Sequence, residues 1–444
     1  FPPVYEKKVA IVVSPLISLM EDQKIKLDIM GIPSTCLNSN VGSKSKIKDQ
    51  ILNNEFRLVY TTPEYIITQE DFIKDLEDLG LLVLIAIDEA HCVSNWGQDF
   101  RESYRNLSQL KKWVNSVPIM ALTATATERV QKDMIKTLKL KDYLLIKTTF
   151  DRDNLFIKIL LKSKDPMNDI LPLLEKNEST IIYCQTRKMT DDINLLLQKN
   201  GILSDAYHAG LNPIDREMIH NDFAENKIWC VVATVAFGMG IDKSIRKVIH
   251  YGVPQDMESY YQEIGRAGRD GIDSFCYAFY NIRDFDVNSY FINQIENVPY
   301  RNHRMELLDM MKKYIYITCC RRKYILEYFG ENYGKDNCGN CDNCCKKTED
   351  KHLKDFTKEA LLLLKSVYDT GSKYGISIVI DILRGSKSKK INPKFKKLSI
   401  YGKGNSFQAE WWKILSRMLI NIGYLREEPI QGGFGFKISI SRDG

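Results

Sequence analysis

The sequence lacks any apolar run long enough to cross a membrane. Its longest, LGLLVLIAI at residues 79–87, has nine residues and ends at Asp88, whereas a membrane-spanning helix needs about 20. Low-complexity segments, short repeats and a secretory signal pattern are missing too. The net charge of +6 over 444 residues is small, so charge alone neither predicts nor excludes a nucleic-acid partner. We expect a globular protein of several domains that is neither secreted nor membrane-embedded.

The phosphate-binding loop of a nucleotide hydrolase is also missing. That loop has the pattern Gly-x-x-x-x-Gly-Lys followed by Ser or Thr. Gly-Lys pairs occur only at residues 334–335 and 402–403, and neither is followed by Ser or Thr. Any nucleotide site in this sequence must therefore be inferred from other motifs.

Cysteine is present but is not arranged as in a disulfide framework. Of eleven cysteines, an odd number, five are isolated and six fall between residues 319 and 345. Such clustering favours one metal site in a reducing compartment. Three of the six are spaced as Cys-x-x-Cys steps, and four thiolates suit tetrahedral zinc. We predict that four residues form a structural zinc site: Cys320, Cys338, Cys341 and Cys344.

The choice of these four leaves alternatives open. Cys319 and Cys345 flank the set and could replace a member. An iron–sulfur cluster or a redox pair could occupy the same cysteines. We also expect Arg321, Arg322 and Lys323, which lie inside the cluster, to contact a DNA backbone.

Short apolar runs alternate with helical patterns through the first two-thirds of the chain. The runs are continuous rather than alternating, which is typical of parallel strands buried on both faces. Two series occur, and we expect strands at 8–13, 57–60, 82–87 and 118–122, then at 180–184, 229–233, 247–251 and 275–280. The pattern predicts two α/β lobes that meet near residue 150.

Asp88 and Glu89 stand at the carboxyl end of a predicted buried strand. Ligands bind at that end in open α/β sheets. One acid can hold Mg²⁺ through water while its neighbour acts as a base, as phosphoryl transfer requires. Taken alone, such a pair is more often a solvated strand end that caps the next helix.

Two arginines strengthen the case for phosphoryl transfer. Arg266 and Arg269, in QEIGRAGRDG (262–271), are three apart, and on a helix they would share one face. From a second lobe they could reach the γ-phosphate as arginine fingers do. MALTATAT (120–127) and VVATVAFGMGIDK (231–243) place small hydroxyl residues at two further strand ends. Together these motifs predict a nucleotide site between two lobes.

In order and spacing, the motifs resemble those of RecQ-type DNA helicases of superfamily two, over nearly the whole chain. The matching segments are VVSPLISLMEDQ at 12–23 (motif Ia), YTTPEYI at 60–66 (Ib), DEAH at 88–91 (II), LTATAT at 122–127 (III), IIYCQTRK at 181–188 (IV), VVATVAFGMGID at 231–242 (V) and YYQEIGRAGRDG at 260–271 (VI). HCVSNWGQDFR at 91–101 resembles the aromatic-rich loop that is specific to RecQ proteins.

The resemblance implies an α/β fold. Two RecA-like lobes with parallel sheets come first, and a helical zinc-binding module and a winged-helix domain follow. The expected boundaries are 1–150, 151–299, 300–350 and 351–444.

The resemblance also implies roles for single residues. Catalysis is assigned to Asp88, Glu89, His91, Arg266 and Arg269. Contacts to ATP and Mg²⁺ are assigned to Asp88, Gly240, Asp242, Gln262, Arg266 and Arg269. DNA contacts in the lobes are assigned to Ser14, Pro15, Trp96, Phe100, Arg101 and Thr234.

The aromatic-rich loop links DNA contact to ATP hydrolysis in that family. Trp96 and Phe100 can stack on unpaired bases, and Arg101 can meet a phosphate. The alternative is that the two rings pack as core residues under the loop.

Residues 352–444 resemble the winged-helix part of the RecQ C-terminal region. RGSKSKKINPKFKK (384–397) holds seven basic residues and no acidic one. Beside a wing such a run would follow the phosphates of duplex DNA, although a basic run is often only a solvated face. DNA contacts are assigned here to Lys387, Lys389 and Lys390, and to Phe434 at the tip of a wing over 428–440.

A helix is expected in FQAEWWKILSRMLINIGYL (407–425), before the wing. Its Trp411, Leu415, Met418 and Ile422 recur at helical spacing, so we predict that they form the core of this domain.

We predict an ATP-dependent 3′–5′ DNA helicase that uses ATP, Mg²⁺ and Zn²⁺ and acts on single-stranded and forked duplex DNA in repair, recombination or replication. The expected compartment is a nucleus, or another that contains DNA, such as a nucleoid or a viral factory. One rival is a catalytically silent DNA-binding or scaffold protein that has lost the phosphate-binding loop. Because the other ATP-related motifs are intact, we expect instead that the printed sequence starts after this loop. The aromatic-rich loop and the cysteines argue against a third reading, an RNA-remodelling DEAH enzyme.

Overall fold

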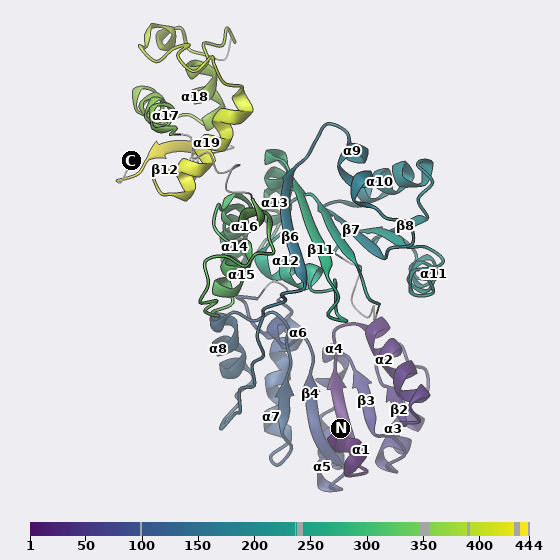
Figure 1. The fold of residues 1–444 in the computed structure, drawn as a ribbon. Helices are drawn as coiled ribbons and strands as arrows, with labels where there is room; N and C mark the ends of the chain where they lie inside the picture. Colours follow the sequence, from purple (N-terminus) through teal and green to yellow (C-terminus); the bar gives the residue numbers. More distant parts are fainter. Residues whose placement is uncertain are drawn as a thin grey trace. The chain divides into compact units, whose positions relative to one another are not determined.

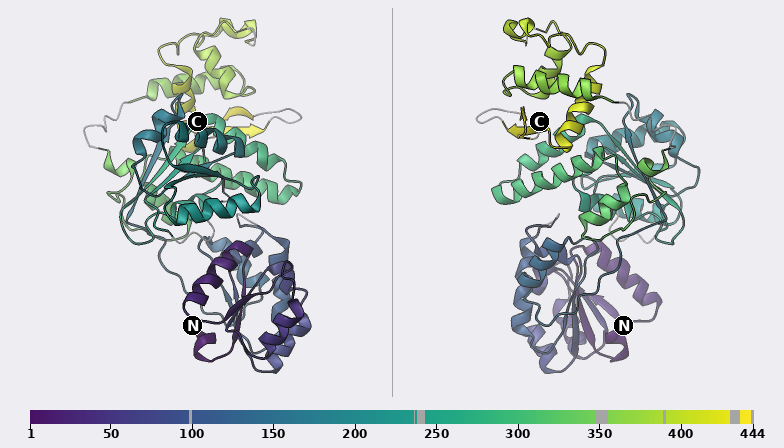
Figure 2. Two further views of the ribbon diagram at one scale, coloured as in Figure 1. Left: turned by 90° about the vertical axis from the view of Figure 1, so that its right-hand side faces the viewer. Right: turned by 60° about the vertical axis from the view of Figure 1, so that its left-hand side comes forward.

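The computed structural model describes residues 1–97, 100–235, 237, 243–346, 355–388, 391–429 and 436–442. It divides the chain into two compact units, residues 1–312 with 319–345 and residues 313–318 with 346–444. The first unit contains two parallel sheets and a cysteine-rich module, and the second contains helices and a two-stranded sheet (Figures 1 and 2). No helix in the described ranges has the length and apolar character that a membrane crossing requires.

The first sheet has five parallel strands in the order β2–β3–β1–β4–β5. They are β1 Val9–Val13, β2 Ser34–Cys36, β3 Leu58–Thr61, β4 Leu82–Ile87 and β5 Ile119–Ala121. The helices of this lobe are α1 Pro2–Tyr5, α2 Ile17–Ile29, α3 Lys44–Leu52, α4 Pro63–Ile66, α5 Glu70–Asp78, α6 Glu102–Asn106, α7 Leu110–Trp113 and α8 Glu128–Thr137. Ile11, Val59 and Ile85 are almost fully buried, as expected for strands covered on both faces.

The second sheet has six parallel strands in the order β6–β11–β10–β7–β9–β8. They are β6 Leu155–Leu161, β7 Thr180–Cys184, β8 Ser204–Tyr207, β9 Cys230–Ala233, β10 Lys247–Tyr251 and β11 Ser274–Tyr280. The helices are α9 Pro166–Ile170, α10 Arg187–Lys199, α11 Pro213–Ala224, α12 Met257–Ile264 and α13 Ile282–Asn293. The side chain of Asp256 caps α12 by accepting from the Ser259 N–H at 2.7 Å, which fixes where this helix starts.

All eight predicted strands are confirmed, each within one residue at either end. Three strands were not predicted: β2, β6 and β8. Each lies at an edge of its sheet. β2 and β8 are short and partly polar, because an edge strand needs less apolar surface than a central one.

The cysteine-rich module contains α14 Val298–Tyr316, α15 Arg321–Tyr328 and α16 Asp342–Cys345. It packs on the outer edge of β6, where Cys341 forms a parallel bridge with Ile157. Asp342 Oδ2 accepts the Ile159 N–H at 3.1 Å. Part of the edge of the second sheet is therefore covered by the segment that carries the cysteines.

Within the described residues, the second unit contains the helices α17 Thr357–Asp369, α18 Ile376–Leu383 and α19 Ala409–Asn421, and a 3₁₀ helix at Pro393–Lys397. It also contains two antiparallel strands, β12 Leu425–Pro429 and β13 Phe436–Ile440. The helix and the paired strands predicted here are confirmed.

The predicted core face of α19 was partly wrong. Leu415 is buried, but Met418 and Ile422 are 42% and 64% exposed. Trp411 is half-buried and stacks on Phe407 at 3.8 Å. The buried face instead follows Trp412, Leu415 and Leu419, a spacing of three and four residues that suits a helix as well. Trp412 can be fully buried because its Nε1 donates to the Gly404 carbonyl at 2.8 Å.

Candidate functional site

Asp88 follows β4 directly, at the carboxyl end of the first sheet. Its Oδ1 accepts the Glu89 N–H at 2.9 Å, and its carbonyl accepts the Tyr104 hydroxyl at 3.0 Å. Burial raises the pKa of the Asp88 carboxyl. A divalent cation would favour the carboxylate and so lower this pKa. The position therefore suits a carboxylate that holds Mg²⁺.

Glu89 has a left-handed backbone conformation, with φ 47° and ψ 43°. Such strain is uncommon outside glycine and is typical of functional sites. The Glu89 carboxylate lies 3.2 Å from His91 Nδ1 and accepts from Gln262 Nε2 at 3.4 Å. His91 Nδ1 is also 2.9 Å from Thr123 Oγ1. Residues from motifs II, III and VI therefore meet, as the sequence analysis expected.

Arg266 and Arg269 do not lie on a helix, so the expectation of a shared helical face was wrong. α12 ends at Ile264, and turns follow in which Gly268 has a φ of +58°. The physical reason is the pair of glycines, Gly265 at the helix end and Gly268 in the left-handed region. Arg266 is buried, whereas Arg269 is exposed.

One cavity of about 1660 Å³ is lined by Glu89, Gln262, Arg266 and Arg269. Thr123 and Thr125 line it too. An acid, two guanidinium groups and two hydroxyls form a set that suits a nucleoside triphosphate with its metal ion. Glu89 of the first lobe and Gln262, Arg266 and Arg269 of the second thus share one cavity.

The free edge of β5 borders the same cavity. Among the described residues β5 pairs only with β4. Met120 on this strand and Leu122 just after it are each 44% exposed. The edge can therefore pair with one further strand.

Trp96 in the aromatic-rich loop is 36% exposed, so it is not a core residue. The Arg129 guanidinium lies over its ring, 3.3 Å from the centroid. His303 of α14 meets the ring edge-on at 5.3 Å, and its Nε2 donates to the Trp96 carbonyl at 2.9 Å. Phe100 is half-buried, with its ring centroid 6.3 Å from that of Tyr300. The loop therefore contacts both α8 and α14.

The other predicted DNA-contacting residues of the lobes lie at strand ends. Ser14 follows β1 and is buried. Pro15 accepts a hydrogen bond from Arg101 Nη1 at 3.4 Å through its carbonyl, which brings motif Ia against the aromatic-rich loop. Thr234 follows β9, and its N–H donates to the Tyr207 carbonyl at 3.1 Å.

Several predicted residues lie outside the described ranges: Gly240, Asp242, Lys389, Lys390 and Phe434. Lys387 is described, and it is exposed on the second unit.

The four cysteines chosen from the sequence come together. The sulfurs of Cys320, Cys338, Cys341 and Cys344 all lie within 4.8 Å of one another. Backbone N–H groups point at three of them: Lys323 at Cys320 (3.4 Å), Asn340 at Cys338 (3.3 Å) and Cys338 at Cys344 (3.4 Å). Donors of this kind stabilise thiolates, which are the form that binds zinc.

A contact within the cluster shifts the pKa values of two thiols in opposite directions. The Cys338 thiol donates to the Cys341 sulfur, which lowers the pKa of Cys341 to about 4 and raises that of Cys338. Cys319 and Cys345 are exposed, and Cys345 Sγ instead donates to the Gly339 carbonyl at 3.1 Å. The four-thiolate site is thus complete without the two flanking cysteines.

The expectation that Arg321 and Arg322 face DNA was wrong. Both are only 4% exposed. Arg321 Nε donates to Asp342 Oδ1 at 2.6 Å, and Arg322 Nη1 donates to Asp151 Oδ1 at 2.7 Å. A charge buried this deeply requires such a partner, so these arginines hold the module together. Lys323 pairs with Asp336 at 2.6 Å and remains partly exposed.

Four residues that support the site are not signalled by the sequence. Arg129 and His303 contact Trp96, and Arg152 and Asn154 hold the turns that carry the two arginines. They stand singly in the sequence and acquire their roles only from tertiary contacts. No pattern or spacing signals them.

Family models match four stretches of the chain. They are the DEAD/DEAH box helicase model at residues 3–134, the helicase conserved C-terminal domain at 163–271, the RecQ zinc-binding model at 282–345 and the RQC domain at 350–441.

Three curated relatives align along nearly the full chain. A protein of Acanthamoeba polyphaga mimivirus, provisionally named an ATP-dependent RNA helicase, is 45% identical over 97% of this chain and 80% of its own length. The bifunctional 3′-5′ exonuclease/ATP-dependent helicase WRN of Mus musculus is 40% identical over 100% of this chain, which spans only 33% of that relative. The ATP-dependent DNA helicase RecQ of Haemophilus influenzae is 37% identical over 94% of this chain and 67% of its own length.

Solved structures share the fold of the two lobes. The DUF1998 helicase MrfA bound to DNA superposes with a TM-score of 0.52 at 20% identity, over 74% of this chain and 51% of that one. S. cerevisiae Dbp5 bound to RNA and ADP BeF3 superposes with a TM-score of 0.50 at 18% identity, over 68% of this chain and 82% of that one.

Proposed function

The chain belongs to the RecQ family of helicases, and from that membership we propose that it hydrolyses ATP to unwind DNA. The observation that carries the proposal is the cavity where Glu89 of one lobe meets Gln262, Arg266 and Arg269 of the other. A nucleotide bound between two lobes can draw them together, and its hydrolysis can release them. Repeated closure of this kind can move a nucleic-acid strand past the protein.

The residues at and beside the cavity have the following roles. When bound, Mg²⁺ neutralises charge on the β- and γ-phosphates, and Asp88 is placed to hold it. Glu89 accepts the proton of the attacking water, and Gln262 and His91 hold its carboxylate in place. Arg269 and Arg266 reach the γ-phosphate from the second lobe. The exposed Arg269 is the better candidate for the finger.

A segment that carries a phosphate-binding loop could be joined to the chain so that its strand pairs with the free edge of β5. If that strand runs parallel to β5, its carboxyl end would lie beside Thr123, at the same end of the sheet as Asp88. A loop after such a strand would lie in the cavity.

DNA contact is proposed for the aromatic-rich loop and for the second unit. Trp96 is exposed within reach of Arg129, whose charge suits a phosphate once the ring takes a base. Ser14, Pro15, Phe100, Arg101 and Thr234 extend this surface. In the second unit Lys387 is exposed. We assign Lys389, Lys390 and Phe434 to the same DNA-binding surface from the sequence.

The finer properties belong to the same proposal. They are a 3′–5′ direction, a preference for forked duplexes, work in repair, recombination or replication, and a DNA-containing compartment such as a nucleus, a nucleoid or a viral factory. DNA is favoured over RNA because the aromatic-rich loop and the four-cysteine module occur together in this chain.

Unwinding assays test the proposal. The protein is the chain extended ahead of Phe1 with the phosphate-binding segment of the Haemophilus influenzae relative, and its control has the loop lysine replaced by alanine. We expect ATP hydrolysis that single-stranded DNA stimulates. We also expect unwinding of 3′-tailed and forked DNA, with no unwinding of 5′-tailed DNA or an RNA duplex. DNA binding without hydrolysis would support a silent DNA-binding protein, and preferential unwinding of RNA would overturn the substrate.

A further inference from the structure

The segment between the two sheets, residues 149–155, holds the cysteine-rich module on one side. Asp151 pairs with Arg322 at 2.7 Å, and the Phe150 N–H donates to Glu331 Oε2 at 2.7 Å. The carbonyls of Asp153 and Leu155 accept from Arg322 Nη2 at 3.4 and 2.8 Å, and Asn340 Nδ2 donates to Asp153 at 2.8 Å. This segment is therefore bound to α15 and to the loop that carries Cys338 and Cys341.

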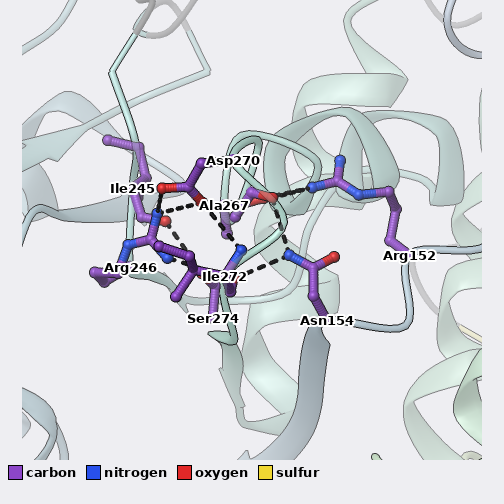
Figure 3. A network of polar contacts seen from close by, with 9 residues as sticks. Arg152, Asn154, Ile245, Arg246, Ala267, Asp270, Ile272 and Ser274 are labelled. Carbon is purple, nitrogen blue, oxygen red and sulfur yellow. Dashed lines mark hydrogen bonds and ion pairs between the residues drawn. The ribbon is translucent and has the colours of Figure 1, made fainter.

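The same segment holds the motif VI turns with its other side chains. Arg152 Nη2 donates to the carbonyls of Ala267 at 2.9 Å and Gly268 at 2.7 Å, and its Nη1 donates to Gly265 at 3.4 Å. Asn154 Nδ2 donates to the carbonyls of Gly268 at 2.9 Å and Ile272 at 3.0 Å. Figure 3 shows both side chains pointing into these turns. The contacted carbonyls flank Arg266 and immediately precede Arg269.

The fit around Gly268 leaves little freedom. Its φ is +58°, and a Cβ built there would lie 2.3 Å from Asn154 Nδ2 and 2.9 Å from the Ile272 carbonyl oxygen. On the far side of the turns, Arg246 Nη2 binds both Asp270 oxygens at 2.7 and 2.5 Å (Figure 3). The turns that carry Arg266 and Arg269 are thus held from two segments: Arg152 binds their backbone carbonyls, and Arg246 binds the Asp270 carboxylate.

An aromatic contact connects the same three parts. The Phe150 ring stacks at 4.6 Å on Phe329, the residue directly after α15, and meets Tyr261 of α12 edge-on at 5.7 Å. The Tyr261 hydroxyl donates to the Phe150 carbonyl at 2.7 Å. Tyr261 directly precedes Gln262, which binds Glu89. Movement of α15 can therefore be transmitted through packed side chains to both Gln262 and the arginine turns.

We propose that Arg152 and Asn154 are positioning residues for the arginine turns, and that segment 149–155 connects the zinc module to ATP hydrolysis. In this role the metal sets the geometry of Arg266 and Arg269, in addition to stabilising its own module. Only the expected effect on the rate of ATP hydrolysis rests on the function proposed above. The positional coupling can be measured without nucleotide.

Hydrogen exchange tests the coupling in the chain as it stands. Arg152→Ala and Asn154→Asp should each speed exchange of the amides in 265–272, while those of β10, Lys247–Tyr251, remain protected. Arg57→Ala is the matched control, because Arg57 also donates to backbone carbonyls but lies in the first lobe. Chelation of zinc should speed exchange in the same turns, although they contain no cysteine. Unchanged exchange in 265–272 in Arg152→Ala, or after chelation, would overturn the respective half of the proposal.

Kinetics of the extended chain separate positioning from general damage. Arg152→Ala should lower kcat by about 10²-fold, the scale of a misplacement near 1 Å, with nucleotide affinity within threefold of the parent. Arg152→Lys should recover part of this loss. Arg152→Ala combined with Arg269→Ala should be no slower than Arg269→Ala alone, because both act on one step. If the losses in kcat of the two single variants multiply in the double variant, Arg152 does not act through Arg269 and the positioning role is wrong. An inactive parent would refute the proposed function and leave the exchange result to decide the coupling.

Discussion

Glu89 combines a strained backbone with a central chemical position. A left-handed residue with a side chain costs roughly 1–2 kcal/mol, so the surrounding contacts must stabilise it. The Ala90 N–H bonds the Leu122 carbonyl at 2.8 Å, and the Cys92 N–H bonds the Glu89 carbonyl at 2.9 Å. The strain directs the carboxylate toward His91 and Gln262.

Replacement of this residue gives the first prediction. In the extended chain, Glu89→Gln should bind ATP normally and lose turnover by ~10²–10⁴-fold, because the amide keeps the shape but cannot accept a proton. Glu128→Gln, on the exposed face of α8, is the control and should hydrolyse at the parent rate. Turnover within tenfold of the parent in Glu89→Gln would remove the role of base from this residue.

Glu258 on α12 gives a prediction about pH. Burial, and next the charge of Asp256, raise its pKa to about 7 from an ordinary 4.5. Between these values the folded state keeps a proton that the unfolded state has lost, so stability falls as pH rises through this window. Glu258→Gln should therefore be more stable than the parent by ~1–3 kcal/mol at pH 8 and equal to it near pH 4.5.

Urea denaturation at the two pH values measures this difference. The amide can still accept from the Tyr328 hydroxyl, which donates to Glu258 Oε1 at 2.5 Å. Glu296→Gln, an exposed position, is the control and should show no such dependence. A Glu258→Gln protein that is less stable than the parent at pH 8 would show that the buried carboxylate is charged and favourable.

Among the secondary-structure elements, the central strands and the edge strand β5 were predictable, whereas the other three edge strands, β2, β6 and β8, were not. Continuous apolar runs such as 82–87 and 180–184 have one physical explanation, burial on both faces. β2 and β8 need no such run, and β6 lies where the expected lobes meet. In α19 two apolar faces compete in the sequence, and only packing around Trp412 decides between them.

The catalytic motifs were predictable as a set because the family resemblance fixes their order. The turns after Ile264 were not, because their shape depends on Arg152 and Asn154 from another segment. The domain boundaries at 150, 299 and 350, the catalytic roles and all of the assigned DNA contacts remain predictions.

The exposed ring of Trp96 in the aromatic-rich loop is expected to connect DNA binding to ATP hydrolysis. Trp96→Ala in the extended chain should leave basal ATP hydrolysis within about twofold and reduce its stimulation by single-stranded DNA, since stacking supplies ~1–3 kcal/mol per base. Tyr290→Ala removes an aromatic ring from α13 that is more exposed than Trp96 and should change neither rate. Full DNA stimulation in Trp96→Ala would mean that this ring serves only its contacts with Arg129 and His303.

For the whole molecule, the separation into two units predicts how the chain responds to loss of zinc. Cys341→Ser should lose its zinc and destabilise residues 300–345, because the free energy of structural zinc binding is folding free energy. The second unit has its own core around Trp412, Leu415 and Leu419, so it should stay folded.

Calorimetry with metal analysis checks this outcome. The parent should hold one zinc per chain and no iron. In Cys341→Ser one unfolding transition should fall in temperature and the transition of the second unit should not. Cys345→Ser is the control and should keep its zinc. Full zinc in Cys341→Ser would show that a flanking cysteine belongs to the ligand set.

The cover that Cys341 and Asp342 form over β6 has a consequence for solubility. β6 is the edge strand LFIKILL, with Lys158 as its one charged residue, and an uncovered edge of this kind can pair with another chain. Removal of zinc should expose the N–H of Ile159 and the residues beside it. Metal-starved protein is therefore expected to self-associate in a concentration-dependent way, visible by light scattering, before either sheet melts.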